Sequence, residues 1–303
     1  MAKDPRVGPV TVGYTEGQLR TVNLPEGQQD PLATATAPMP VQQSQPLVLF
    51  DPSQIKVVIL AGGRGTRLQD VSKGVLPKPM IRVGEMPLVE HIMRIYAAQG
   101  FRKFIIAAGF LKEVIIEWVA DNRIRLRQMA DEIEVVDTGE DTQTGGRIRA
   151  LADHLNYGPF FMMTYGDGLS DVNLAALLDL HLRLQLQSPQ GLVTLTAARP
   201  PARFGSMDIG PSGFVRAFGE KVQMTEGWIN SGFYVIDRSI LRLIAGENSK
   251  FEYDVLPILA SQQSLAAFQH PGFFQMVDNW RDLQTLKELW ASGNPPWARW
   301  QTG

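Results

Sequence analysis

The sequence predicts an α/β fold: a mostly parallel, Rossmann-like doubly wound sheet with a small antiparallel cap and an N-terminal arm. Between residues 55 and 199, short β-branched runs alternate with segments whose apolar residues have helical spacing. This alternation is typical of a parallel sheet with helices on both faces. Shorter, turn-rich strands follow residue 199, and residues 1–54 differ in composition from the rest. We therefore divide the chain into an arm or linker of residues 1–54 and a main domain of residues 55–303.

The arm combines a hairpin pattern with a linker. Residues 7–27 alternate loosely between glycine turns, which predicts a small hairpin. Residues 30–46 hold prolines among small and polar residues, the composition of a linker. Two interpretations stay open: a poorly ordered leader, or an arm that packs on a neighbouring subunit.

In the main domain, apolar runs bounded by turns or glycines predict the strands of the sheet. These runs are residues 55–60, 103–109, 133–138, 158–168 and 191–198. Helical spacing predicts helices between and after them, and Gly100 and Gly293 are expected to follow two of the helix ends. The expected helices are residues 87–100, 111–129, 172–187 with Asp171 as N-cap, and 282–292 with Asp282 as N-cap.

The stretches 203–221 and 227–236 are expected to form the antiparallel cap. The aromatic tail, residues 294–300, is expected to pack on the body of the domain.

Composition excludes several classes of function. The formal net charge is −2, so no general positive field attracts nucleic acid. There are no cysteines, which excludes disulfides and cysteine metal sites, and the 4 histidines lack zinc-site spacing. No apolar run is long enough for a membrane span, and the N-terminus has no apolar signal core. We expect a cytoplasmic protein with neither a membrane nor a nucleic-acid partner.

A glycine-rich, cationic loop follows the first predicted strand of the main domain. Glycines let backbone N–H groups approach a ligand and form an anion nest, and nearby cations add charge. The glycines are Gly62, Gly63 and Gly65, and the cations are Arg64, Arg67 and Lys78, the last between two prolines. The loop is neither a Walker A motif nor a dinucleotide fingerprint, because Leu68 stands where the third glycine would be. The pattern predicts a polyphosphate site.

Two aspartates follow predicted strands at the expected ligand-binding edge of the sheet. Asp167 lies in YGDG after one strand, and Asp278 follows the apolar stretch 272–277. Ligands of open α/β sheets bind at the carboxyl ends of the strands. A hard cation such as Mg²⁺ needs few carboxylates when phosphate oxygens and water complete its shell.

The order of motifs resembles that of the sugar-1-phosphate nucleotidyltransferases. Residues 60–68, LAGGRGTRL, and residues 77–80, PKPM, match the pattern of that family. Further segments resemble the branch that uses CTP and glucose 1-phosphate: residues 136–148, 164–171, 199–209, 228–235 and 288–300. The likeness covers about residues 55–300 and implies Asp167 and Asp278 as the metal ligands.

The resemblance also implies roles for residues at matching positions. Arg67, Lys78 and Lys221 are the implied catalytic cations. The implied nucleotide-binding residues are Leu60, Ala61, Gly62, Gly63, Gly65, Thr66, Arg67, Lys78, Gly145, Gly146, Arg147 and Asp167. The implied sugar-phosphate residues are Tyr165, Glu220, Lys221, Asn230 and Glu252, some of them in or near the cap, which makes it a sugar-binding cap.

The implied reaction joins CTP and glucose 1-phosphate to give CDP-glucose and pyrophosphate, with Mg²⁺ as cofactor, and a homo-oligomer is expected. Departures from the family pattern bear on substrate choice: EKV at 220–222, Leu76 before PKPM, GFLK at 109–112 and MVDNWRD at 276–282. Two alternatives stay open. One is the same transfer with UTP, dTTP or another sugar 1-phosphate, and the other is a non-catalytic relative that binds nucleotide sugars.

Overall fold

The computed structural model describes residues 7–15, 18–25, 50–65, 75–188, 190–199, 206–209, 215–219 and 227–301, and it separates residues 1–49 from residues 50–303 as two compact units. In the first unit, β1 (Val7–Thr15) and β2 (Gln18–Pro25) pair antiparallel. The hairpin predicted for residues 7–27 is therefore confirmed. The predicted linker, residues 30–46, lies outside the described residues.

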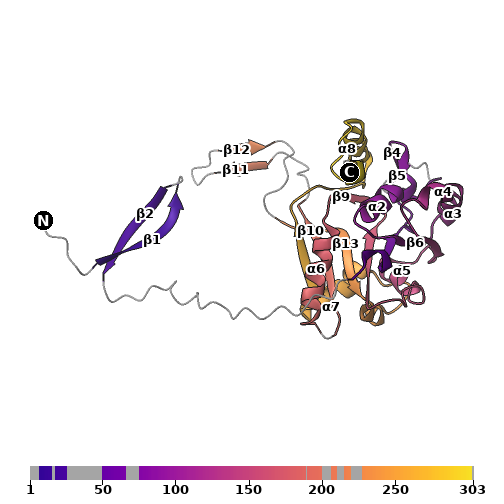
Figure 1. The fold of residues 1–303 in the computed structure, drawn as a ribbon, viewed down its shortest axis with the longest axis horizontal. Helices are drawn as coiled ribbons and strands as arrows, with labels where there is room; N and C mark the ends of the chain where they lie inside the picture. Colours follow the sequence, from indigo (N-terminus) through magenta and orange to yellow (C-terminus); the bar gives the residue numbers. More distant parts are fainter. Residues whose placement is uncertain are drawn as a thin grey trace. The chain divides into compact units, whose positions relative to one another are not determined.

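The second unit is built on a seven-stranded sheet with the order β14-β10-β13-β8-β3-β6-β7 (Figure 1). Its strands are β3 (Lys56–Leu60), β6 (Lys103–Ala108), β7 (Glu132–Asp137), β8 (Phe160–Tyr165), β10 (Val193–Ala198), β13 (Ile229–Asp237) and β14 (Leu265–His270). All neighbours pair parallel except where β13 is involved. The predicted mostly parallel sheet is confirmed, and each of its five predicted strands is present.

The strand β13 corrects one prediction. The stretch 227–236 was expected in the antiparallel cap, but β13 lies inside the sheet, antiparallel to both β8 and β10. Residues 231–237 are all buried. A strand of a solvent-facing cap would bury one face only, so this continuous burial favours the centre of the sheet. The strand β14 at the edge was not predicted.

Helices cover both faces of the sheet, since two separate hydrophobic cores contain alternate residues of its strands together with residues of different helices. The α-helices of this unit are α2 (Leu88–Ala97), α3 (Lys112–Asp121), α4 (Arg123–Leu126), α5 (Thr144–Ala150), α6 (Leu174–Gln185), α7 (Leu256–Ser261) and α8 (Trp280–Ala291). Its shorter helical turns are the π-helix η5 (Phe251–Val255) and the 3-10 helices η1 (Pro52–Gln54), η3 (Lys78–Met80), η4 (Arg238–Leu243) and η6 (Arg299–Gln301). Alternate residues of β3 serve two cores. Val57 and Ile59 pack with α2, α6 and α8, whereas Val58 and Leu60 pack with α5 and α7. The doubly wound architecture is therefore confirmed.

Two predicted helix caps were wrong. Asn173, not Asp171, caps α6, because its side chain accepts the N–H of Ala176 at 3.0 Å. Asn279 caps α8, and Asp282, the third residue of the helix, completes the capping box with Asn279. In both places two cap-forming side chains lie within three residues, and the pattern does not rank them.

The predicted helix 111–129 is interrupted at Asn122, whose side chain donates to the carbonyl of Trp118 at 2.8 Å. The aromatic tail packs on the body as predicted, since Trp297 is buried and stacks on Trp290 and Phe273. The short strands β11 (Ser206–Ile209) and β12 (Val215–Gly219) form an antiparallel pair within the predicted cap. Two further pairs are β4 (Arg82–Val83) with β5 (Met86–Pro87), and β9 (Gly168–Ser170) with β15 (Phe274–Met276).

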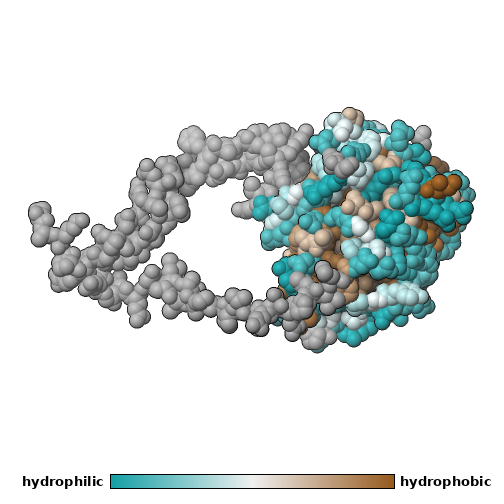
Figure 2. All heavy atoms as spheres, in the orientation of Figure 1, coloured by the Kyte–Doolittle hydropathy of each residue, from teal (hydrophilic) through white to brown (hydrophobic). Residues whose placement is uncertain are grey.

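Hydrophilic residues predominate on the face of the second unit shown in Figure 2, with apolar residues between them. Within the described part of the chain, every helix is too short or too polar to cross a bilayer.

Candidate active site

A cleft of about 820 Å³ opens at the carboxyl ends of β3 and β8. These neighbouring parallel strands end at Leu60 and Tyr165, and Gly166 donates its N–H to the carbonyl of Leu60 at 3.0 Å. Such an edge is where open α/β sheets bind ligands, and the volume suits a nucleotide-sized molecule. The predicted site residues that line the cleft are Leu60, Ala61, Gly62, Gly63, Gly65, Lys78, Arg147, Tyr165, Asp167, Asn230, Glu252 and Asp278. Thr66, Arg67, Glu220 and Lys221 lie outside the described residues.

Gly65 and Gly62 are needed in the loop for two different reasons. Gly65 has φ +57°, in the left-handed region, and a Cβ there would lie 3.2 Å from Lys78 Cβ. A Cβ on Gly62 would lie 2.0 Å from the guanidinium of Arg147. The loop is thus held between a lysine on one side and a buried arginine on the other.

Arg147 is buried and hydrogen-bonds the backbone of the glycine loop. Its guanidinium donates to the carbonyl of Gly62 at 2.8 Å and to that of Gly139 at 2.6 Å, and also to Thr138 Oγ1 at 2.8 Å. Burial lowers the pKa of Arg147, and the charges of Asp137 and Asp141 oppose this shift only in part. These bonds hold the loop in place, and the contact of Arg147 with a nucleotide stays a prediction.

Gly145 and Gly146 do not line the cleft. A Cβ on Gly145 would lie 2.8 Å from the carbonyl oxygen of Ser249, and one on Gly146 would lie 2.2 Å from that of Glu247. Both glycines are buried and let the start of α5 approach the backbone of residues 247–249 closely. The geometry gives them this packing role, and their contact with a nucleotide stays a prediction.

Lys78, Asp167 and Asp278 form a charged cluster on the floor of the cleft. The Nζ of Lys78 lies 2.5 Å from Asp167 Oδ2 and 3.2 Å from Asp278 Oδ1. All three side chains are largely buried, with 13%, 20% and 25% of their surfaces exposed. Asp167 Oδ1 is also buried and has no hydrogen-bond partner among the described residues. Two converging carboxylates, one with an unused buried oxygen, suit a hard divalent cation that completes its shell with phosphate oxygens and water.

A second cluster, the tyrosine network, is formed in the same cleft by residues of β8, β13 and η5. Tyr165 donates its hydroxyl to Glu252 Oε1 and lies 2.9 Å from the hydroxyl of Tyr234, while Asn230 donates its side-chain amide to Tyr234. Thr144 donates to Glu252 Oε2 at 2.6 Å. Burial raises the pKa of Tyr165 and of Tyr234, so both act as neutral hydroxyls at pH 7. The three predicted sugar contacts Tyr165, Asn230 and Glu252 are thus brought together.

Sequence analysis missed Tyr234 and Thr144 as members of this network. Tyr234 lies in an apolar strand and shares a strand face with Asn230 at a spacing of four residues. That spacing could have indicated that Tyr234 and Asn230 belong to one site. It does so only once β13 is known to pair with β8, which brings Tyr234 to Tyr165.

Two cations near the cleft are ion-paired. Arg64, in the glycine loop, lies 2.8 Å from Glu140 and 2.9 Å from Asp141 across the mouth of the cleft. Lys112, the lysine of the GFLK departure, pairs with Asp137. Lys112 and Asp137 are not among the residues that line the cleft.

The fold, the glycine loop and the paired carboxylates define a protein that binds nucleoside phosphates at the edge of an α/β sheet. Residues 56–294 match the family model for nucleotidyl transferases, and the chain belongs to this family. Within it, the chain is 38% identical to a glucose-1-phosphate cytidylyltransferase of Salmonella typhi over 264 residues, which cover 82% of this chain and 100% of the relative. It is also 32% identical to a probable glucose-1-phosphate cytidylyltransferase of Bacillus subtilis, over 81% of this chain and 100% of the relative.

A solved structure agrees with this placement. The crystal structure of HddC from Yersinia pseudotuberculosis in complex with GMP-PN matches with a TM-score of 0.60 and 25% identity, and covers 78% of this chain and 99% of that chain.

Proposed function

We propose that this chain transfers the cytidylyl group of CTP to α-D-glucose 1-phosphate, giving CDP-glucose and pyrophosphate. The observation that carries the proposal is the pairing of two unlike clusters in one cleft: Lys78 with Asp167 and Asp278, and the tyrosine network around Glu252. The first suits phosphates and a cation, and the second suits sugar hydroxyls. Likeness over the full length of glucose-1-phosphate cytidylyltransferases supports this choice of substrates.

The chemistry balances without a general base. An oxygen of the glucose phosphate attacks the α-phosphorus of CTP in line, and a new P–O bond forms. The bond between the α-phosphorus and the bridging oxygen of the β-phosphate breaks, and pyrophosphate leaves with the electron pair. The attacking phosphate is already anionic at pH 7, so the barrier is the approach of two anions.

The residues of the cleft then have separate tasks. The N–H groups of the glycine loop, with Thr66 and Arg67, would bind the β- and γ-phosphates, and Lys78 would stabilise charge on the α-phosphate. Lys221 would bind the sugar phosphate. Glu252, Asn230 and Glu220 would bind sugar hydroxyls, with Tyr165 fixing Glu252.

Asp167 and Asp278 would hold Mg²⁺. When bound, Mg²⁺ orients the phosphates and offsets their charge. Lys78 then has two roles: its Nζ pairs with both carboxylates, and it would lie beside the reacting phosphate in the complex.

A substrate panel tests the proposal. Pyrophosphate release is measured with CTP, UTP or dTTP and glucose 1-phosphate, and with CTP and galactose 1-phosphate, each with and without Mg²⁺. We expect kcat/KM for CTP with glucose 1-phosphate to exceed the others by about 10-fold or more. A preference for another nucleotide would overturn the cytidylyl assignment, and binding without turnover would favour the non-catalytic alternative. The expected homo-oligomer and cytoplasmic location stay predictions.

A further inference from the structure

The two proposed metal ligands lie at one end of a short β-ladder. In this ladder β9 pairs antiparallel with β15, with Gly168 opposite Met276 and Ser170 opposite Phe274. Asp167 immediately precedes Gly168, and Asp278 is two residues beyond Met276. The N–H of Val277 donates to the carbonyl of Asp167 at 2.9 Å and extends the pairing to the charged cluster. The ladder therefore determines how Asp167 and Asp278 face each other.

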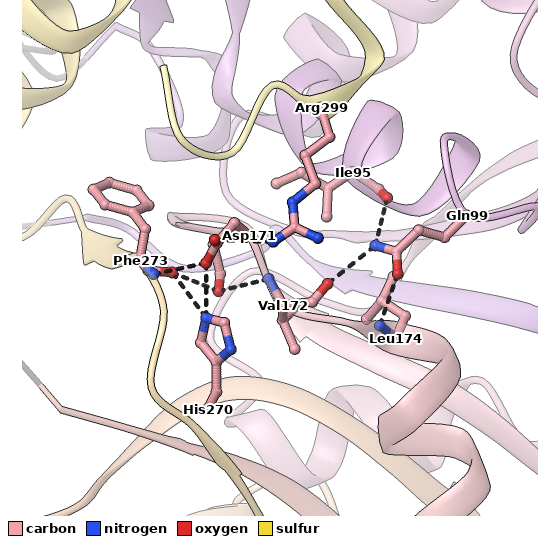
Figure 3. Close-up of polar contacts among 9 residues, drawn as sticks. Ile95, Gln99, Asp171, Val172, Leu174, His270, Phe273 and Arg299 are labelled. Atoms are coloured by element: carbon pink, nitrogen blue, oxygen red, sulfur yellow. Dashed lines mark hydrogen bonds and ion pairs between the residues drawn. The ribbon is translucent and has the colours of Figure 1, made fainter. Parts of the chain in front are cut away.

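Asp171 closes the opposite end of the same ladder (Figure 3). Its Oδ1 accepts the N–H of Phe273 at 2.6 Å and lies 2.9 Å from His270 Nε2. Its own N–H donates to the carbonyl of Phe273 at 3.2 Å, and the hydroxyl of Ser170 donates to that same carbonyl at 2.8 Å. Its Oδ2 lies 3.0 Å from Arg299 of the C-terminal tail. One carboxylate thus joins β9, β15, the end of β14 and the tail.

Burial alone would raise the pKa of Asp171, but hydrogen bonds from His270 and Arg299 outweigh burial and lower it. The side chain is therefore an anion at neutral pH. A two-stranded ladder of three pairs is weak by itself and depends on contacts at its ends.

We infer that Asp171 is a positioning residue for the reaction, which holds the β9–β15 ladder so that Asp167 and Asp278 bind their cation together. The inference rests on the proposed function, because it assumes a divalent cation at these carboxylates. Asp171 is not among the residues that line the cleft. Its effect passes through the ladder, as that of residues that support metal ligands generally does.

The test compares Asp171→Ala and Asp171→Asn with Asn173→Ala as a matched control. Asn173 lies two residues away, and its side chain caps α6 by accepting the N–H of Ala176. Mn²⁺ binding in the presence of CTP, without glucose 1-phosphate, is measured by electron paramagnetic resonance, which needs no turnover. The Mg²⁺ concentration for half-maximal activity and the thermal midpoint are measured on the same samples.

We expect Asp171→Ala to weaken Mn²⁺ binding about 10-fold and to raise the Mg²⁺ requirement similarly. Asp171→Asn, which keeps an oxygen for Phe273, should weaken binding about 3-fold, and Asn173→Ala should stay within about 2-fold of the wild type despite a lower thermal midpoint. Unchanged Mn²⁺ binding in Asp171→Ala would overturn the inference. If that variant does not fold, unchanged binding in Asp171→Asn does the same. A wild-type chain with no metal-dependent turnover would instead defeat the proposed function.

Discussion

The two clusters of the cleft share one strand end but use different physics. Asp167 and Tyr165 are two residues apart at the end of β8, yet Asp167 lies in an ion-paired cluster and Tyr165 in a network of neutral hydroxyls. The charged cluster holds one cation between two carboxylates. The tyrosine network holds one carboxylate, that of Glu252, among hydroxyl donors.

We expect this difference to separate substrate binding from chemistry. Charge on the phosphates grows and moves in the transition state, so the charged cluster should act mainly on kcat. Sugar hydroxyls keep the same hydrogen bonds throughout, so the tyrosine network should act mainly on the KM of glucose 1-phosphate. The junction between the clusters, at Tyr165–Asp167, is where the reacting phosphate is expected.

The largest expected effect comes from Asp167→Asn. This change removes the charge of the carboxylate that has the unused buried oxygen, and with it the metal. We expect Mg²⁺-dependent turnover to fall about 10³-fold or more with folding intact. Pyrophosphate release and circular dichroism measure the two properties, and Asp131→Asn, on the surface beside Arg102, is the matched control. A near-wild-type rate would remove the metal assignment.

Lys78→Ala should lower kcat about 10²- to 10³-fold at saturating substrates, because one cation is lost beside the α-phosphate. The comparison of clusters requires that the loss appear in kcat, not in the sugar KM alone. Steady-state kinetics with both substrates varied distinguish the two. Lys103→Ala, a lysine that bonds Gln54 outside the cleft, should leave both constants unchanged.

Tyr234→Phe probes the other side of the comparison. It removes the hydroxyl that links Tyr165 and Asn230 and keeps the ring in the core. We expect the KM of glucose 1-phosphate to rise about 3- to 10-fold with little change in kcat, the effect of one lost hydrogen bond. Tyr157→Phe, on an exposed ring, is the control. A loss confined to kcat would break the division of labour between the clusters.

The smallest effect on activity is expected at His91, a buried residue that does not line the cleft. A change there should alter stability and leave the roles of the two clusters untouched. Burial lowers the pKa of His91 to about 4 from 6.5. Its Nε2 hydrogen-bonds the carbonyl of Val83, and its Nδ1 accepts the indole N–H of Trp297 in the tail. Between pH 6.5 and about 4 the unfolded chain binds a proton that the folded chain does not. The contribution of neutral His91 to the free energy of unfolding is therefore fully present above pH 6.5 and falls by about 3 kcal/mol as pH drops to about 4.

Urea unfolding at several pH values measures this slope. His91→Gln should flatten it, because the buried imidazole is then absent. Equal slopes in His91→Gln and the wild type would contradict the assignment.

Local patterns were sufficient for part of the fold and of the site. The glycine loop and Asp167 each follow a strand within a few residues, and a strand with its following turn is a local pattern. Asp167 and Asp278 are far apart in the chain, and the family resemblance, not periodicity, paired them. Lys78 and Asp278 are 200 residues apart, and their contact was not predicted.

Other features depend on non-local pairing. Tyr234 lies in an apolar run, and only the insertion of β13 beside β8 turns its hydroxyl toward Tyr165. Asp171 has the sequence context of a helix cap, yet its carboxylate accepts the N–H of Phe273, which is 102 residues away in the chain. Arg147 was singled out by the family resemblance, and its hydrogen bond to the carbonyl of Gly62, 85 residues away, could not be read from a local pattern.

A crystal structure with Mg²⁺, glucose 1-phosphate and a CTP analogue that cannot release pyrophosphate tests the central claim most directly. The account predicts the cation between Asp167 and Asp278, Lys78 Nζ on the α-phosphate, and glucose hydroxyls on Glu252 and Asn230. Phosphates bound away from Lys78, or a sugar bound away from Glu252, would contradict it.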